Sequence, residues 1–165
     1  MDLDNSMQDY KNAMSRVPTS VGVVWTLNAN NQIVGCTISS FMSVSIDRNE
    51  QVVAFILKTS SRTAAILETQ DDFQVSILNE DQVLLARTFA SDDRFVENNL
   101  EIFSQDNWRH DCVCEFKIKA RQKFVIGGSQ LLIADVLSYF YNPTKKPLVY
   151  SARSFSKILR SPVLN

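Results

Sequence analysis

The sequence IVGCTISSFMSVSI, from Ile33 to Ile46, has the composition of a β-strand and decides the fold prediction. Alternate side chains of a strand point to opposite faces of its sheet. One face would be mostly apolar and would meet a core, whereas the other would carry hydroxyls and no charge. The apolar face comprises Val34, Cys36, Ile38, Ser40, Met42, Val44 and Ile46, and the polar face comprises Gly35, Thr37, Ser39, Phe41, Ser43 and Ser45.

The uncharged hydroxyl face of this stretch is unusual for either a solvated or a core surface. Solvated strand faces carry Lys or Glu, and core faces carry Val or Leu. Hydroxyls without charges suit a surface that is partly removed from water and faces a polar ligand. Gly35 would let such a ligand come close to the backbone. A hydroxyl-rich strand at a subunit contact explains the same pattern equally well.

Composition places the chain among single-domain globular proteins. It has 165 residues, of which 45% are apolar, and its net charge is −1. We expect one domain over residues 1–165 and no broad attraction to nucleic acid or to an anionic membrane. No apolar run approaches the roughly 20 residues that span a bilayer. The acidic N-terminus and the three cysteines favour reduced thiols in a cytoplasm.

Hydrophobic patterns along the chain predict a mainly β fold. Residues 6–16 are expected to form a helix, because Met7, Tyr10 and Met14 share one face. Another helix is expected at 80–90, and a loop with a helical piece at 91–107. Strands are predicted at residues 21–27, 33–46, 52–58, 73–78, 113–126 and 131–141. A short extended segment is expected at 148–151, and the residues after it are expected to form a tail. Six strands with a few peripheral α-helices suggest an antiparallel β-barrel.

The turn from Thr59 to Thr63 is predicted to be an anion site. It follows a strand and begins a helix, whose first turn has unpaired N–H groups and the positive end of the dipole. Hydroxyls together with the Arg62 guanidinium would suit a phosphate. Ordinary N-capping by Ser60 or Ser61 is the simpler alternative.

His110, Cys112 and Cys114 alternate and would share one face of a strand. Zinc uses such ligands, but a structural site needs a fourth, and the usual paired-cysteine spacings are missing. We interpret the cysteines as small, partly buried thiols and the histidine as a surface residue. His110 is also the one histidine in the chain, so nucleophilic catalysis with a histidine base finds little support.

The hydroxyl strand and the phosphate turn together describe a site for an organic ligand that carries a phosphate. Flavin mononucleotide, FMN, fits this description, because its ring edges need N–H and O–H donors and its phosphate needs an anion site. In such an enzyme the flavin carries the hydride chemistry and the protein supplies position and electrostatics.

Several segments resemble the short-chain flavin reductases, the reductase components of two-component flavin-dependent monooxygenases. The resemblance runs from about Tyr10 to Tyr150. Its most specific part is Thr37-x-Ser39-Ser40-Phe41-x-Ser43-Val44-Ser45, and the weaker parts are Pro18 to Val21, Phe55 to Lys58, Ser61 to Thr63 and Phe73 to Leu78.

The resemblance implies a homodimeric split β-barrel that binds FMN or FAD near the dimer interface. It implies that NADH or NADPH reduces the flavin, which then passes to a flavin-dependent monooxygenase. The residues carried over are Thr37, Ser39 and Ser40 for the ring and ribityl chain, Ser61, Arg62 and Thr63 for the phosphate, Pro18 and Thr19 beside the ring, and Tyr150 and Arg153 by the flavin or nicotinamide.

Two positions depart from the family pattern. Where the family usually has Gly-Asp-His, this chain reads Gly127-Gly128-Ser129-Gln130, and Arg48-Asn49-Glu50 replaces a common proline pair. Ser129 or Gln130 would then do part of the missing histidine's work. The leading hypothesis is an NAD(P)H:flavin oxidoreductase. The alternatives are a flavin-dependent oxidase or monooxygenase that does not use nicotinamide, and a non-catalytic flavin-binding dimeric module.

Overall fold

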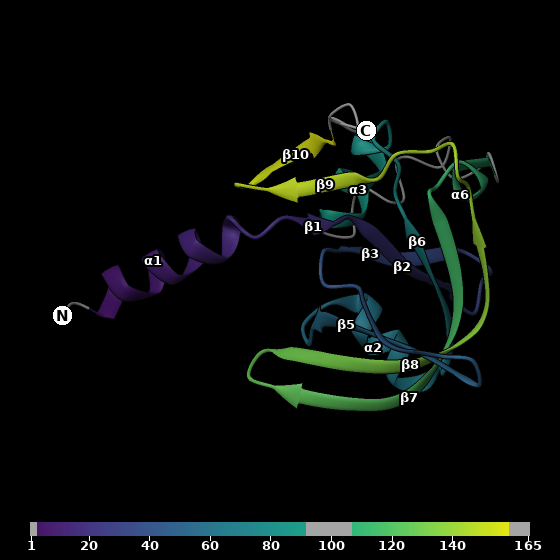
Figure 1. The fold of residues 1–165 in the computed structure, drawn as a ribbon. Coiled ribbons are helices and arrows are strands. Elements are labelled where there is room, and N and C mark those ends of the chain that lie inside the picture. Colours follow the sequence, from purple (N-terminus) through teal and green to yellow (C-terminus); the bar gives the residue numbers. More distant parts are fainter. Residues whose placement is uncertain (1–2, 92–106, 159–165) are drawn as a thin grey trace.

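The computed structural model describes residues 3–91 and 107–158, and Figure 1 shows their fold. The described helices are α1 (Leu3–Ser15), α2 (Arg62–Thr69), α3 (Val83–Ala90) and α6 (Asn107–His110). The described strands are β1 (Thr19–Ser20), β2 (Gly22–Leu27), β3 (Ile33–Ile38), β4 (Met42–Asp47), β5 (Glu50–Lys58), β6 (Asp72–Ile77), β7 (Cys114–Ile126), β8 (Ser129–Tyr141), β9 (Leu148–Ser151) and β10 (Ser154–Lys157).

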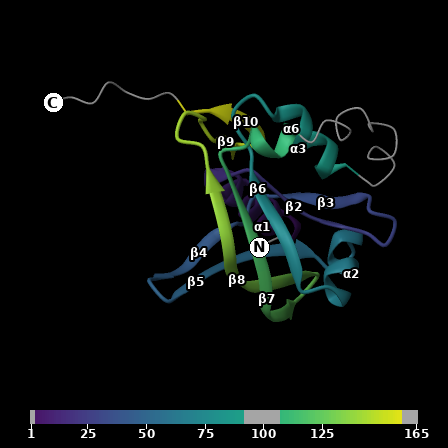
Figure 2. The same ribbon diagram turned by 90° about the vertical axis from the view of Figure 1, so that its right-hand side faces the viewer.

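Seven antiparallel strands form one sheet in the order β3-β2-β6-β7-β8-β5-β4. The sheet curls, because Ile38 near one edge and Phe55 near the other belong to the same buried cluster. Within the described residues no strand ladder joins its two edges, so the barrel is split, as predicted. A smaller sheet, β1-β9-β10, lies beyond one end, as Figures 1 and 2 show.

Two hydrophobic clusters hold the fold together. The first lies inside the curled sheet and includes Phe55, Phe73 and Leu132, which are at most 2% exposed. The second includes residues of β2 and α3, and in it Trp25 meets Trp108 edge to face with ring centroids 5.8 Å apart. Burial of such large side chains contributes about 1.5–3 kcal/mol each. The second cluster therefore fixes α3 against β2 and β3.

The predicted turns and most predicted strands are confirmed. The hairpin between β2 and β3 closes through a hydrogen bond from Asn28 N–H to the carbonyl oxygen of Gln32. The tight turn between β7 and β8 contains Gly127 at a φ of 59°, a conformation that glycine adopts without strain. The helix predicted at residues 80–90 is α3, and it begins later than expected, at Val83. Most of the predicted loop at 91–107 lies outside the described residues.

The prediction of one continuous strand from Ile33 to Ile46 was wrong. The stretch breaks at Ser39–Phe41 and forms two strands, β3 and β4, at opposite edges of the sheet. β3 is half-buried, whereas most of β4 is exposed, and Ile46 reaches 86%. A strand that crosses from one edge of a curled sheet to the other must turn, so its side chains no longer share two continuous faces.

The structure corrects two further predictions. The segment after Ser151 was predicted to be a tail, but residues 154–157 form strand β10, which pairs with β9. His110 ends the short helix α6, so it does not alternate with Cys112 and Cys114 along one strand. Within the described ranges, no group of three His, Cys, Asp or Glu side chains could hold a metal ion.

Helix α1 extends away from the sheets, as Figure 1 shows. Two hydrogen bonds tie its C-terminal part to the β9–β10 turn, from Ala152 N–H to the carbonyl oxygen of Ser15 and from Arg153 Nη2 to Asn12 Oδ1 at 2.9 Å. Met7, Tyr10 and Met14 are each more than half exposed. None of the helices in the described part of the chain combines the length and apolar character needed to cross a membrane.

Candidate functional site

The turn before α2 has the local structure of an anion site. Ser61 is the N-cap of the helix, and its Oγ accepts a hydrogen bond from Ala64 N–H at 3.1 Å. Arg62 is exposed at the first helical position, and Thr63 is 2% exposed on the inner side of the helix. A capping hydroxyl keeps its own proton for a second partner. The turn thus presents a cation and a helix N-terminus to solvent, while the Thr63 side chain faces the core.

Two other predicted residues lie near the end of β5, where this turn begins. Ser40 Oγ accepts from Ile56 N–H at 2.8 Å and donates to the Ile56 carbonyl oxygen at 3.2 Å. Ser129 pairs with Lys58, the last residue of β5. Because strands rise about 3.3 Å per residue, Ser40 lies about 7 Å along β5 from its end. The structure therefore gathers Ser40, Ser129 and the phosphate turn, which we call the turn cluster, around one end of β5.

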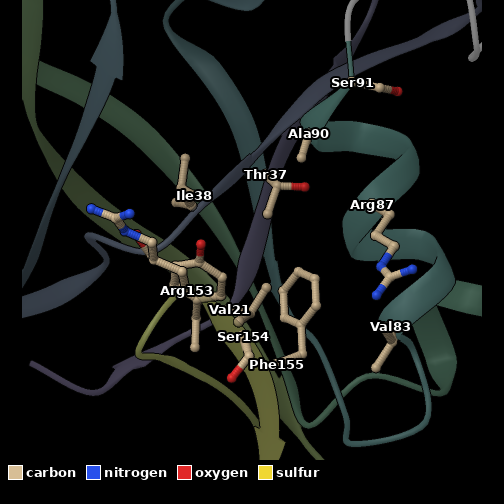
Figure 3. A pocket seen from close by; sticks show the side chains of 12 residues that line it. Val21, Thr37, Ile38, Val83, Arg87, Ala90, Ser91, Arg153, Ser154 and Phe155 are labelled. Carbon is tan, nitrogen blue, oxygen red and sulfur yellow. The ribbon is translucent and has the colours of Figure 1, made fainter. Parts of the chain in front are cut away.

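A cavity of about 730 Å³ lies between the end of β3, α3 and the β9–β10 hairpin, and Ser39 is one of its lining residues. Four predicted residues line it, namely Thr37, Ser39, Tyr150 and Arg153. Figure 3 labels Thr37 and Arg153 among them. Ligand pockets commonly have volumes of about 300–1,000 Å³. The predicted residues thus divide between this cavity and the turn cluster, and Ser39 and Ser40 join the two places.

Hydrogen bonds fix the position of the predicted residues around the cavity. Thr37 Oγ1 donates to the Ala86 carbonyl oxygen at 2.6 Å, which ties β3 to α3. Thr19 pairs with Tyr150 across β1 and β9, and its Oγ1 donates to the Tyr150 carbonyl oxygen at 3.4 Å. Pro18 is exposed just before β1. The Thr37 hydroxyl proton is therefore used within the protein, whereas both lone pairs of its oxygen are left to accept hydrogen bonds from a ligand.

The tip of the β9–β10 hairpin is a strained element at the mouth of the cavity. Ala152 and Arg153 have φ values of 49° and 61°, in the left-handed region that favours glycine and asparagine. A two-residue hairpin turn requires this conformation. Strained residues of this kind concentrate at functional sites, which is consistent with a ligand role for Arg153.

Gly35 does not leave room for a ligand beside the backbone, contrary to the prediction from the sequence. A Cβ added there would lie 2.6 Å from the Val24 carbonyl oxygen and 2.8 Å from Trp25 Cβ. The next nearest atom is Phe89 Cε1, at 3.1 Å. The protein itself therefore fills the space beside Gly35, so this glycine permits close packing of β2, β3 and α3 and not the approach of a ligand.

Ser129 and Gln130 occupy different environments. Successive strand residues face opposite sides, and Gln130 is only 5% exposed. Its Oε1 is buried and has no hydrogen-bond partner within the described residues. Ser129 is half-buried and belongs to the turn cluster. Of the two residues that would replace the family's histidine, Ser129 is the one beside the phosphate turn.

Sequence reasoning missed most of the residues that line the cavity, among them Arg87 and Phe155. Arg87 lines it from α3, and Phe155 lines it from β10 (Figure 3). Arg87 follows Val83 by four residues, so the two share one helix face, which was the available signal. Phe155 could not be found in this way, because its segment was interpreted as a tail.

Two of the three cysteines, Cys112 and Cys114, are poor nucleophiles. Burial raises the pKa of the Cys112 thiol to about 12 and that of the Cys114 thiol to about 11. A thiol reacts as its thiolate, which is scarce at neutral pH when the pKa is this high. These two cysteines are therefore not candidates for a nucleophile at neutral pH.

Comparison with known proteins gives a consistent picture. Residues 14–159 match the family described as flavin reductase like domain. The NADH:FMN oxidoreductase of Rhodococcus qingshengii is 30% identical over 132 residues, which cover 78% of this chain and 67% of that protein. The reductase component of the trigonelline monooxygenase of Acinetobacter baylyi is 35% identical over 99 residues, covering 59% of this chain and 31% of that protein.

A solved structure extends the comparison to the whole fold. The NADH:FAD oxidoreductase of Streptomyces globisporus, solved in complex with NAD and FAD fragments, superposes with a TM-score of 0.81. The match covers 100% of this chain and 98% of that one at 19% sequence identity. At this identity the likeness supports the split-barrel fold.

Proposed function

The chain belongs to the flavin reductase like domain family, and from this membership we infer that it is an NAD(P)H:flavin oxidoreductase. In this role it transfers a hydride from NADH or NADPH to FMN or FAD and supplies reduced flavin to a partner monooxygenase. The family match spans most of the sequence, so we treat residues 1–165 as one catalytic domain.

Within the structure, the observation that supports flavin binding is the contact between Ser40 and Ile56. It joins the hydroxyl-bearing segment after β3 to the strand that leads into the phosphate turn. A ligand with a polar ring at one end and a phosphate at the other fits two such sites at short separation. This contact therefore supports one cradle for a flavin, formed by the end of β3 and the start of α2.

We assign each predicted residue a role in this cradle. Arg62 and Ser61 would bind the flavin phosphate, with Thr63 contributing its backbone N–H. Ser39, Ser40 and Thr37 would orient the ring and ribityl chain, and Pro18 and Thr19 would border the ring. When bound, the flavin supplies the ring that accepts the hydride. Ser129 would donate a hydrogen bond near the phosphate turn, and Tyr150 and Arg153 would contact the flavin or nicotinamide from the cavity.

The proposed function is tested by titrating the purified protein with FMN and with FAD, and then adding NADH without oxygen. Flavin binding at micromolar concentration and loss of flavin absorbance after NADH would support the proposal. A protein that binds flavin but never bleaches it with NADH or NADPH would instead belong to the class of flavin enzymes that do not use nicotinamide.

Replacing Arg62 tests the phosphate role of the turn. Arg62→Ala removes a charged donor, so flavin binding should weaken by about 1–3 kcal/mol, the range for a charge-assisted hydrogen bond. Arg48→Ala is a matched control, because Arg48 is also exposed but lies in the turn between β4 and β5. An unchanged flavin affinity in Arg62→Ala would show that this turn does not bind the flavin phosphate.

We further propose that the protein is a homodimer in the cytoplasm. The exposed Met7, Tyr10 and Met14 of α1 support a second copy as partner, because an isolated helix of 13 residues is marginal in water. An apolar groove of about 460 Å³ beside β4, lined by Phe41, Ile46 and Tyr139 among others, offers a second apolar surface. The three free cysteines agree with a reducing compartment.

A further inference from the structure

Helix α1 and the tip of the β9–β10 hairpin are joined by two hydrogen bonds. Ala152 N–H donates to the carbonyl oxygen of Ser15 at 2.6 Å. Arg153 Nη2 donates to Asn12 Oδ1 at 2.9 Å, across 141 positions of the sequence. Arg153 lines the cavity, whereas neither Asn12 nor Ser15 is among the described residues that line it. A contact outside the cavity therefore reaches a side chain in the cavity wall.

The end of α1 is suited to hold a cation and an N–H donor. The carbonyl oxygens of the last helical turn lack partners within the helix, and they form the negative end of its dipole. The last turn of α1 contains no basic residue of its own. The hairpin supplies both groups, because the Arg153 guanidinium brings a positive charge and Ala152 N–H satisfies a carbonyl oxygen. The helix end and the hairpin tip therefore stabilise each other.

The hairpin tip needs support from outside the hairpin. Ala152 and Arg153 have φ values of 49° and 61°, and residues other than glycine persist there only where the surrounding structure holds them. An arginine side chain also has many rotamers, so a turn of the backbone does not by itself fix the guanidinium. Within the part of the chain that the structure describes, Asn12 Oδ1 is the hydrogen-bond acceptor for the Arg153 guanidinium. The position of this guanidinium therefore depends on Asn12.

We propose that Asn12 is a positioning residue, which holds the Arg153 guanidinium at the cavity so that Arg153 can bind the ligand there. The inference rests on the proposed function, which assigns Arg153 to the flavin or the nicotinamide. A guanidinium has several N–H donors and Asn12 uses one of them, so the others stay available to a ligand. A side chain that is already fixed loses less entropy on binding. Asn12 thus acts on the ligand through Arg153 and without touching it.

The test measures two constants on the full-length protein, the Kd for FMN by fluorescence quenching and the KM for NADH with FMN as acceptor. Arg153→Ala should raise at least one of them. Asn12→Ala should raise the same constant by about three- to tenfold, as expected when a charged hydrogen bond is lost. Asn12→Asp keeps an oxygen acceptor and should retain most of the affinity of wild type. Lys11→Ala changes an exposed neighbour on α1 and should alter neither constant.

A double-mutant cycle separates positioning from a general effect on folding. Asn12→Ala should cause no further loss in the Arg153→Ala protein, because no guanidinium is left to position. Alanine has a higher helix propensity than asparagine, so circular dichroism should show that α1 keeps its helix. Additive losses from the two substitutions, an unchanged affinity in Asn12→Ala, or an Arg153→Ala protein that binds like wild type would each overturn the inference.

Failure of this inference is separable from failure of the proposed function. If NADH bleaches FMN on the wild type while both constants of Asn12→Ala equal those of wild type, the reductase function stands and the positioning role is overturned. If NADH never bleaches FMN, the reductase function fails. The FMN affinities of the same variants then decide the positioning role, because a non-additive loss supports it and an additive or absent loss overturns it.

Discussion

Strands β3 and β4 come from one uninterrupted stretch of similar composition, yet they occupy opposite environments. β3 lies at one edge of the sheet and is covered by α3, so its residues are half-buried or buried. β4 lies at the other edge, and Met42, Val44 and Ile46 are each more than half exposed. The comparison teaches that alternating apolar and hydroxyl residues predict a strand, whereas the surroundings of each face depend on where that strand joins the sheet.

The largest loss of stability is expected for a substitution on β3, at Gly35. Gly35→Ala places a Cβ 2.6 Å from the Val24 carbonyl oxygen, so β2 and β3 must move apart. Overpacking of this kind costs about 1–3 kcal/mol or more of the free energy of unfolding. Urea denaturation measures the loss. Gly128→Ala is the control, because no atom lies within 4 Å of the added Cβ, and equal stability of the two variants would contradict the packing argument.

A smaller effect is expected at Thr37, which joins β3 to α3. Thr37→Val keeps the shape but removes the hydrogen bond to the Ala86 carbonyl oxygen, which should cost about 0.5–1.5 kcal/mol of stability. Thr37→Ser keeps the hydroxyl and should retain most of that amount. Thermal unfolding of both variants makes the comparison. A Val variant as stable as the Ser variant would mean that this bond does not hold α3 in place.

On the β4 side, a substitution should affect association and not folding. Ile46→Lys adds a charge to a side chain that is 86% exposed and that lines the apolar groove. The stability of the monomer should change by less than about 0.5 kcal/mol, as for other surface sites. If the proposed homodimer uses this edge, sedimentation velocity should show more monomer. An unchanged monomer–dimer distribution would place the dimer contact elsewhere.

The smallest expected effect on stability at neutral pH concerns the thiols of Cys112 and Cys114. This effect grows as the solution becomes alkaline. Burial raises their pKa values in the folded protein to about 12 and 11, from 9.0. Below pH 9 the thiols are neutral in both states, so their contribution to stability is complete. As the pH rises from 9 toward 11 and 12, thiols of the unfolded chain ionise first and stability is lost.

The alkaline loss is measured by urea denaturation between pH 8 and pH 10. Cys114→Ala should show a shallower decline of stability with pH than wild type, because one of the two thiols is gone. Cys36→Ala is the comparison on β3. A Cys114 variant with the same pH dependence as wild type would show that its burial does not control ionisation.

Particular residues show how far the sequence could predict the candidate site. Ser61 and Arg62 were predicted because a helix start has a local signature, and α2 begins at Arg62 with Ser61 as its N-cap. The pairing of Ser40 with Ile56 could not be predicted, because it depends on how the two edges of the sheet approach each other. Arg87 was missed for the same reason, since only the packing of α3 beside β10 and β3 gives it a cavity.

The sequence alone determined the mainly antiparallel strand content, the helix that starts after the phosphate turn, and the resemblance to flavin reductases. These features depend on local periodicity, capping and motif spacing, which act over a few residues. The tertiary structure decided that the segment from Ile33 to Ile46 divides between two sheet edges, that Gly35 serves packing, and that Arg87 faces a cavity. These outcomes depend on contacts between residues far apart in the chain, and no local pattern specifies such contacts.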